Sequence, residues 1–192
     1  TGDLALAFYR AAPHLPVIAL DFAPEMLALG RAKAAAMNIP SPLLPAEDGS
    51  ASTAETGIAF CLADALALPL RDNSVAVASV AFGLRNVADL DGGLKEMVRV
   101  VRPGGKVLVL EFTRPAGWLF GPLYMFYIRH IVPLLGRLLS AAAGDAYRYL
   151  PQSVQAFAGP EEIRARMAAA GLRSVRATAL TFGVVHLYVG MK

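Results

Sequence analysis

Two polar residues whose side chains could take part in chemistry, Arg85 and Asn86, follow a run of mostly small and branched apolar residues at 75–82. Such a run predicts a buried strand, and open parallel sheets bind their ligands at the carboxyl ends of strands. An arginine keeps its proton in proteins, but its fixed N–H donors can stabilise negative charge on a ligand oxygen. Asn86 can donate to the same oxygen or orient the ligand. A salt-bridged surface arginine is the simpler alternative, which the preceding buried strand disfavours.

The start of the chain and Asp21 form a second candidate group. Thr1, Gly2 and Asp3 open a helical pattern, which is similar to the end of a glycine-rich nucleotide turn with free helix N–H groups. Asp21 follows the apolar run 17–20 about twenty residues later, where a carboxylate can accept both hydroxyls of a ribose. Alternatively, Asp21 caps the next helix. This group alone fits a nicotinamide enzyme as well as an enzyme that uses S-adenosylmethionine (SAM).

Asp64 and Ala65 help to separate these two classes. They follow the expected strand 58–62, so the Asp64 carboxylate can accept a hydrogen bond from the exocyclic amine of an adenine. The backbone N–H of Ala65 can reach the purine ring. An aspartate that only shapes a turn is nearly as common at such a position.

The elements that must position these residues alternate along the chain. Strands are expected at 17–20, 58–62, 75–82 and 107–112, with helices from Pro24 and over about 90–101, ended by Pro103-Gly104-Gly105. This order predicts an α/β fold, a mostly parallel sheet with helices on both faces. A last helix at 159–171 precedes an antiparallel pair of strands at 174–181 and 184–190. No strand precedes the helical pattern at Leu4, so we expect a first strand to be missing from this chain.

Composition limits the classes of function. A length of 192 residues, 56% of them hydrophobic, predicts one domain, 1–192, that is truncated at its N-terminus. The longest apolar runs, 118–128 and 131–135, are interrupted by Arg129 and His130 and fall short of the ~20 residues of a membrane span. The small net charge of +3 is scattered and predicts no nucleic-acid partner. The lone Cys61 and the scattered histidines predict no disulfide and no metal site.

Longer motifs carry a resemblance to a known family. The chain resembles the UbiE/COQ5 quinone-biosynthesis C-methyltransferases, within the class I SAM-dependent methyltransferases, almost from end to end. The motifs that carry it are Phe82-Gly83-Leu84-Arg85-Asn86-Val87, Arg99-Val100-Val101-Arg102-Pro103-Gly104-Gly105, Leu110-Glu111-Phe112, Tyr147-Arg148-Tyr149-Leu150-Pro151-Gln152-Ser153-Val154 and Leu180-Thr181-Phe182-Gly183-Val184-Val185.

The resemblance implies a Rossmann-like fold, with SAM as the methyl donor and Thr1, Gly2, Asp3, Asp21, Asp64 and Ala65 as its binding residues. It further implies C-methylation of a polyprenyl hydroquinone, demethylmenaquinol to menaquinol as the preferred case. Arg85 would then stabilise an ionised ring oxygen, with Asn86 beside it. For the proton acceptor, Tyr147, Tyr149, His130, a water and bulk solvent all stay open. The segment 113–158 is expected to be a helical insertion that covers the substrate.

The resemblance also implies a cytoplasmic protein, peripheral to the inner face of the membrane. Transient contact with the membrane surface, assisted by Arg129, Arg137 and Lys192, would give access to a lipid substrate, and a homodimer is compatible with this. Two other functions stay open. One is methylation of a ubiquinone precursor or of another phenolic or lipid acceptor. The other is a lipid-binding scaffold of the same fold without catalysis.

Overall fold

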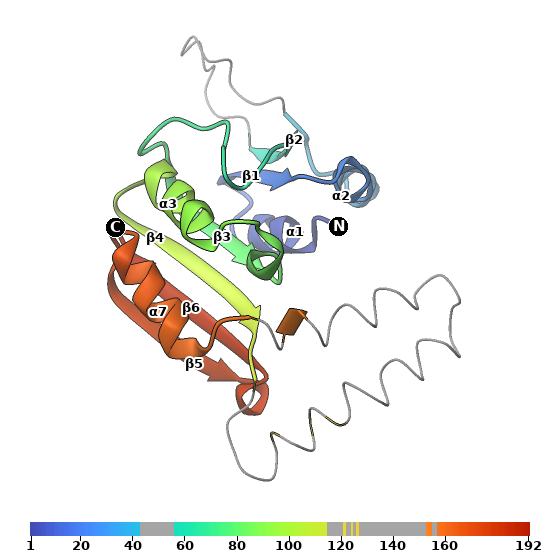
Figure 1. The fold of residues 1–192 in the computed structure, drawn as a ribbon. Helices are drawn as coiled ribbons and strands as arrows, with labels where there is room; N and C mark the ends of the chain where they lie inside the picture. The colour runs from blue at the N-terminus through green and yellow to red at the C-terminus, as the bar shows by residue number, and fades with distance from the viewer. Residues whose placement is uncertain (43–55, 115–120, 122–123, 125, 127–152, 155–156) are drawn as a thin grey trace. The chain divides into compact units, whose positions relative to one another are not determined.

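The structure is a computed structural model that describes residues 1–42, 56–114, 121, 124, 126, 153–154 and 157–192. By their contacts, the residues form two compact units, Thr1–Pro69 and Leu70–Lys192 (Figure 1). Each unit is described by itself. Of the predicted covering segment 113–158, most residues lie outside the described part of the chain. Its covering role and the single domain 1–192 stay predictions.

The first unit contains two parallel strands and two helices. The elements are α1 (Asp3–Ala11), β1 (Pro16–Asp21), α2 (Pro24–Ala36) and β2 (Gly57–Leu62). Pro24 stands in the first turn of α2, where its missing N–H costs nothing because that turn has no intrahelical acceptor. β1 and β2 run parallel in register from Pro16 opposite Gly57 to Asp21 opposite Leu62. Their carboxyl ends therefore lie at one edge, as predicted.

The core of the first unit lies between the helices and the strands. Its buried residues are Ala5, Leu6, Leu27, Ala34, Ile39, Ile58 and Phe60. Leu27 and Ala34 of α2 lie seven residues apart and so share one helix face, and in α1 Tyr9 packs on the cluster one turn after Ala5. Burial of this face fixes α1 and α2 against the sheet and thereby positions the loops at its carboxyl edge.

The second unit is built on a four-stranded mixed sheet. Its strands are β3 (Val75–Ala81), β4 (Val101–Phe112), β5 (Arg173–Leu180) and β6 (Val185–Met191), in the order β3-β4-β6-β5. β3 and β4 are parallel, whereas β6 is antiparallel to both β4 and β5. The predicted antiparallel pair of closing strands is therefore confirmed, together with the α/β class of the fold.

One predicted boundary is wrong. Pro103, Gly104 and Gly105 were expected to form the turn before a strand at 107–112, but β4 already begins at Val101; its register with β3 shifts between Val101 and Lys106, so these residues form an irregularity within the strand. Gly105 shows why the segment can join the sheet: a Cβ there would lie 2.5 Å from the carbonyl oxygen of Ala76 in the neighbouring strand. Only glycine lets the two backbones come this close.

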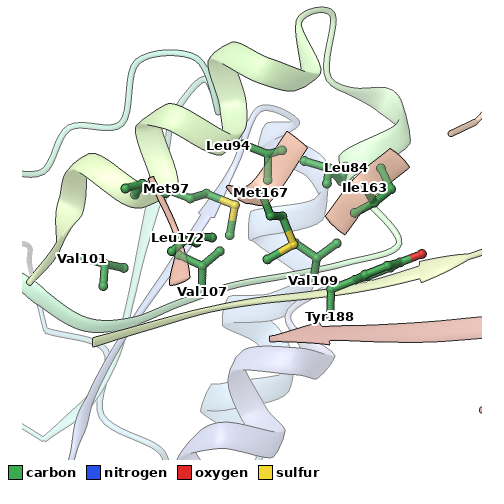
Figure 2. Packing of buried hydrophobic residues seen from close by; sticks show 11 residues of the cluster. Leu84, Leu94, Met97, Val101, Val107, Val109, Ile163, Met167, Leu172 and Tyr188 are labelled. Carbon is green, nitrogen blue, oxygen red and sulfur yellow. The ribbon is translucent and has the colours of Figure 1, made fainter. Parts of the chain in front are cut away.

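Two helices cover one face of this sheet. They are α3 (Leu90–Val100) and α7 (Pro160–Ala169). Asp89 begins α3 by accepting hydrogen bonds from the N–H groups of Asp91 and Gly92, both at 3.1 Å. Figure 2 shows Met97 and Met167 in the middle of the shared core, with Leu94 on the helix side and Val107 and Val109 on the strand side. This packing fixes the ends of β3 and β4, where the next elements begin.

Across the described residues, no helix is both long enough and apolar enough to span a membrane.

Candidate active site

Asp21 and Asp64 lie at the same edge of the first unit. The N–H of Ala63 donates to the carbonyl oxygen of Asp21 at 3.0 Å, so the chain after β2 stays beside the end of β1. One carboxylate oxygen of Asp21 accepts from the N–H of Ala23, and one of Asp64 accepts from the N–H of Leu66, both at 2.9 Å. Each aspartate shapes its own turn, and its second carboxylate oxygen has no hydrogen-bond partner among the described residues.

Two large apolar side chains at this edge were not singled out from the sequence. Phe22, which directly follows β1, is 76% exposed, and Leu62, the last residue of β2, is 58% exposed. Leu62 is the register partner of Asp21, so both side chains stand next to the carboxylates. Exposed apolar groups beside polar ones are typical of a ligand site. Their place beside the carboxylates follows from the register of β1 and β2, whereas the sequence alone does not distinguish them from other hydrophobic residues.

The N-terminus of α1 lies on the side to which the β1 arrow points (Figure 1). Gly2 precedes the helix with φ at +75°, and a Cβ there would lie 2.9 Å from the Cα of Gly30 in α2. The lack of a side chain at Gly2 therefore allows the start of α1 to pack closely against α2. No side chain caps the first N–H groups of the helix, which leaves them available to a ligand.

Asp3 has a structural partner. Its carboxylate accepts from the Lys33 ammonium at 2.8 and 2.9 Å and from the Thr1 hydroxyl. The hydrogen bond from Lys33 is the main reason why the pKa of Asp3 is lowered. Asp3 therefore ties α1 to α2, and the predicted contact of Thr1 and Asp3 with the cofactor stays a prediction.

Arg85 lies in the short 3-10 helix η1 (Leu84–Asn86), directly after β3. The chain leaves the strand at Phe82, where φ is +57° and the N–H still donates to the carbonyl oxygen of Leu110 at 2.8 Å. Leu84 is buried in the core beneath. With Leu84 held inside, the next side chain turns toward the carboxyl end of β4. Asn86 is exposed on the following position.

The guanidinium of Arg85 points into the protein and pairs with Glu111 at the end of β4. Nη1 lies 2.6 Å from the Glu111 carboxylate, and the side chains are only 10% and 0% exposed. Nη1 also donates to the Phe82 carbonyl oxygen and Nε to the Ser153 hydroxyl. The guanidinium carbon lies 5.4 Å from the centre of the Phe112 ring. Within the described part of the chain, Nη2 has no hydrogen-bond partner.

Glu111 is the functional residue that sequence reasoning missed. It belongs to a motif quoted for the family resemblance, but no role was predicted for it. Its other contacts are the N–H of Phe112 at 2.9 Å and the N–H of Arg85 at 3.3 Å. Because a buried carboxylate needs a cation and several donors, its position at the end of a buried strand was the available signal.

A cavity of about 400 Å³ adjoins Arg85. Its lining includes Leu84, Val87 and Leu90 from the β3–α3 connection, and Phe157 and Gly159 before α7. Arg85, Arg114 and Arg166 contribute positive charge to its wall. The volume lies in the range of small-molecule sites, and the lining also includes the Glu162 carboxylate, so charged groups form a large part of its wall. The arginines of this wall can meet an anionic group of a ligand.

The arrangement of strands and helices defines a class of protein. The fold is similar to that of a SAM-dependent methyltransferase from Aquifex aeolicus, with a TM-score of 0.62 and 15% sequence identity over 98% of this chain and 74% of that one. At this identity the likeness concerns the fold, which is the Rossmann-like fold of class I SAM-dependent methyltransferases, as predicted.

Sequence comparison then gives the family. The model of the ubiE/COQ5 methyltransferase family matches residues 1–192, and the chain belongs to this family. It is 45% identical to demethylmenaquinone methyltransferase of Thermus thermophilus, over 99% of this chain and 78% of that protein. The corresponding values for demethylmenaquinone methyltransferase of Deinococcus radiodurans are 42%, 100% and 72%. The chain is thus an enzyme, a SAM-dependent methyltransferase, and the predicted family and methyl donor are confirmed.

The Glu111 carboxylate can be tested by the substitution Glu111→Gln. This change leaves the Arg85 charge buried without its counter-ion, so we expect the free energy of unfolding to fall by about 3 kcal/mol. Denaturant titration followed by circular dichroism measures it. Glu161→Gln is the matched control, because Glu161 pairs with Arg164 in the open, at side-chain exposures of 82% and 43%. Equal loss of stability in both variants would contradict a structural role for the buried pair.

Proposed function

We propose that this enzyme transfers a methyl group from SAM to a ring carbon of a polyprenyl hydroquinone, with demethylmenaquinol as the preferred substrate. The observation that carries the proposal is the buried Arg85 guanidinium beside this cavity, held by Glu111 and with Nη2 without a hydrogen-bond partner among the described residues. The names of the relatives support the substrate. Two are demethylmenaquinone methyltransferases, and a third, from Geobacter sulfurreducens, is a ubiquinone/menaquinone biosynthesis C-methyltransferase.

The first unit offers hydrogen-bond donors and acceptors that match those of SAM. The free oxygens of Asp21 and Asp64 can accept from the ribose hydroxyls and the adenine amine. Ala65 offers its N–H, and Phe22 and Leu62 offer apolar surface for the purine. The first N–H groups of α1, which follow Gly2, can donate to an anionic group of the ligand. When bound, SAM supplies a methyl group made electrophilic by its sulfonium sulfur.

Arg85 would act on the acceptor. A ring carbon becomes nucleophilic enough to attack a methyl group when the neighbouring hydroxyl is ionised. Nη2 of Arg85, whose side chain is only 10% exposed, can donate to that oxygen, and a donor held in a fixed position stabilises the charge that develops there. Glu111 fixes the guanidinium before the substrate arrives, so no reorganisation is needed during the reaction. Asn86, one residue on, would orient the ring.

A polyprenyl substrate is a lipid, so we propose transient contact of the enzyme with the cytoplasmic face of the membrane. A basic surface would assist such contact through anionic lipids. Of the three basic residues expected to contribute, Arg129 and Arg137 lie outside the described residues. Lys192 is otherwise engaged: its ammonium donates to the Asn73 side chain at 2.8 Å and to the Val98 carbonyl oxygen at 2.7 Å. It fixes the end of α3.

The activity is tested by the mass of the product. Incubation with SAM and a short-chain demethylmenaquinol, kept reduced, should give S-adenosylhomocysteine and a quinol heavier by one methylene unit. A phenolic ubiquinone precursor and a non-quinol phenol serve as competing acceptors. Methylation of the non-quinol phenol alone would overturn the substrate class, and absence of transfer to any acceptor would favour the scaffold function.

Arg85→Lys separates catalysis from cofactor binding. Lysine keeps the charge near Glu111 but lacks the second amino group of the fork. We expect kcat to fall about 100-fold, which is the typical loss for one donor to a developing oxyanion, while the Kd for SAM stays unchanged. Arg176→Lys, an exposed arginine of β5, is the control. A parallel loss of SAM binding in Arg85→Lys would remove the assigned role.

Asp21→Ala should have the opposite effect. Loss of a charged acceptor of two hydroxyl groups weakens binding by about 1.5–3 kcal/mol, so the Kd for SAM should rise at least 10-fold. Isothermal titration calorimetry measures it without any acceptor present. Glu25→Ala removes an exposed carboxylate four residues further on and should leave the Kd unchanged. If both variants bind SAM as the wild type does, Asp21 only shapes its turn.

A further inference from the structure

The proposed reaction needs a group that takes the proton from the quinol hydroxyl. Three side chains expected for this task, His130, Tyr147 and Tyr149, lie outside the described residues. In the second unit, several other ionisable groups near Arg85 are unsuited. Arg85 keeps its proton, and Glu111 is completely buried with both carboxylate oxygens engaged. Burial raises the pKa of Tyr188 to about 12, so its hydroxyl stays protonated.

His186 lies directly beside this group. It is the second residue of β6 and the register partner of Glu111 in the antiparallel pair of β4 and β6. Directly opposed residues of such a pair point to the same face, with their Cβ atoms about 5 Å apart. The His186 ring and the Arg85 guanidinium are thus both neighbours of the Glu111 carboxylate. This is the carboxyl end of β4, where the ligand of Arg85 is proposed to bind.

Thr113 fixes the protonation of the His186 ring. The Thr113 hydroxyl donates its one proton to the Gly183 carbonyl oxygen at 2.9 Å. The same oxygen lies 2.7 Å from Nδ1 of His186, so it accepts there and Nδ1 carries the hydrogen. In the neutral ring, Nε2 then holds the lone pair. None of the described residues hydrogen-bonds to Nε2, and a neutral imidazole in this form is a ready proton acceptor.

The surroundings keep the ring neutral. Burial lowers the pKa of His186. Among the described residues, the titratable groups that share its face are Glu111 on β4 and Tyr188 on β6, whose ring lies 6.0 Å away, and α7 brings Glu161 close enough to act on Tyr188. On its other side β5 places Ala179, which carries no charge. The negative charge of Glu111 alone would favour protonation of His186, but the Arg85 guanidinium offsets it at 2.6 Å.

We propose that Nε2 of His186, held in place by Thr113, accepts the proton of the quinol hydroxyl during methyl transfer. The inference rests on the proposed function. The O–H electron pair stays on the ring oxygen, and the adjacent ring carbon forms its new bond to the methyl carbon. The electron pair of the broken carbon–sulfur bond leaves with the sulfur. The ring carbon then loses its hydrogen as a proton to water, and the imidazolium returns its own proton to the ring oxygen.

The substitution His186→Gln tests the proposal in the full chain. Methyl transfer to a reduced short-chain demethylmenaquinol is followed in single turnovers from pH 5 to pH 9. The wild-type rate should fall as the pH drops through the pKa of His186, because the protonated ring cannot accept a proton. In His186→Gln the rate should fall about 100-fold, and this acid limb should vanish. His14→Gln, an exposed histidine of the first unit, should match the wild type.

A second measurement does not depend on turnover. Nitrogen NMR of the imidazole should find the proton on Nδ1 and an unprotonated Nε2 at neutral pH. Addition of 4-methoxy-1-naphthol, a stable naphthol with one ionisable hydroxyl, should shift the His186 resonances. A proton on Nε2, no response to the naphthol, or transfer by His186→Gln within threefold of wild type would each overturn the proposal. A wild-type enzyme that methylates no quinol would instead refute the proposed function. The NMR measurement would still test the protonation of His186 and its contact with the naphthol.

Discussion

Arg85 and Glu111 form an ion pair that solvent hardly reaches, and the arrangement of the site follows from it. An unpaired carboxylate at a completely buried position would cost several kcal/mol, so Glu111 requires the guanidinium as much as Arg85 requires the carboxylate. Two backbone N–H groups, of Arg85 and Phe112, complete the coordination of Glu111. The pair therefore defines one orientation of Arg85, in which Nη1 is bound to the protein and Nη2 has no hydrogen-bond partner among the described residues.

The parallel pairing of β3 and β4 creates the place for this ion pair. Ala81 is opposite Leu110, and Phe82 still bonds to the Leu110 carbonyl oxygen before the chain turns away. Phe82 adopts a positive φ, which costs a non-glycine residue of order 1 kcal/mol or more and persists where the surrounding structure enforces it. Here the buried Leu84 on one side and the Arg85 pair on the other enforce it. A local strain is thus held by the same contacts that orient the proposed catalytic group.

Sequence patterns predicted the position of those residues that directly follow a strand in the sequence. Asp21 and Asp64 were expected to share an edge because each follows an apolar strand, and parallel strands end on the same side. Arg85 was expected at the end of β3 for the same reason. The partner of Arg85 was not predictable in this way, since Glu111 reads as one residue of a strand until the register of β3 and β4 is known.

His186 shows the same limit over a longer distance in sequence. Its partner Thr113 is 73 residues away, and its neighbour Glu111 is set by the antiparallel register of β4 and β6. The start of β4 was misplaced for a related reason: Pro103-Gly104-Gly105 was expected to precede the strand, whereas β4 begins at Val101 and a Cβ at Gly105 would meet the backbone of Ala76. Periodicity reports which face of an element is apolar, but it does not report which residue of another element lies opposite.

In the proposed mechanism one ion pair has two electrostatic consequences. A carboxylate that faces an imidazole stabilises the imidazolium and raises its pKa, which would occupy the proton acceptor before the substrate binds. Pairing Glu111 with Arg85 removes most of that field, so burial determines the direction of the shift and the pKa of His186 is lowered. When the quinol oxygen ionises, its charge is met by Nη2 of the same arginine. Arg85 therefore stabilises the anion that forms and, through Glu111, keeps the nearby base in the state that can form it.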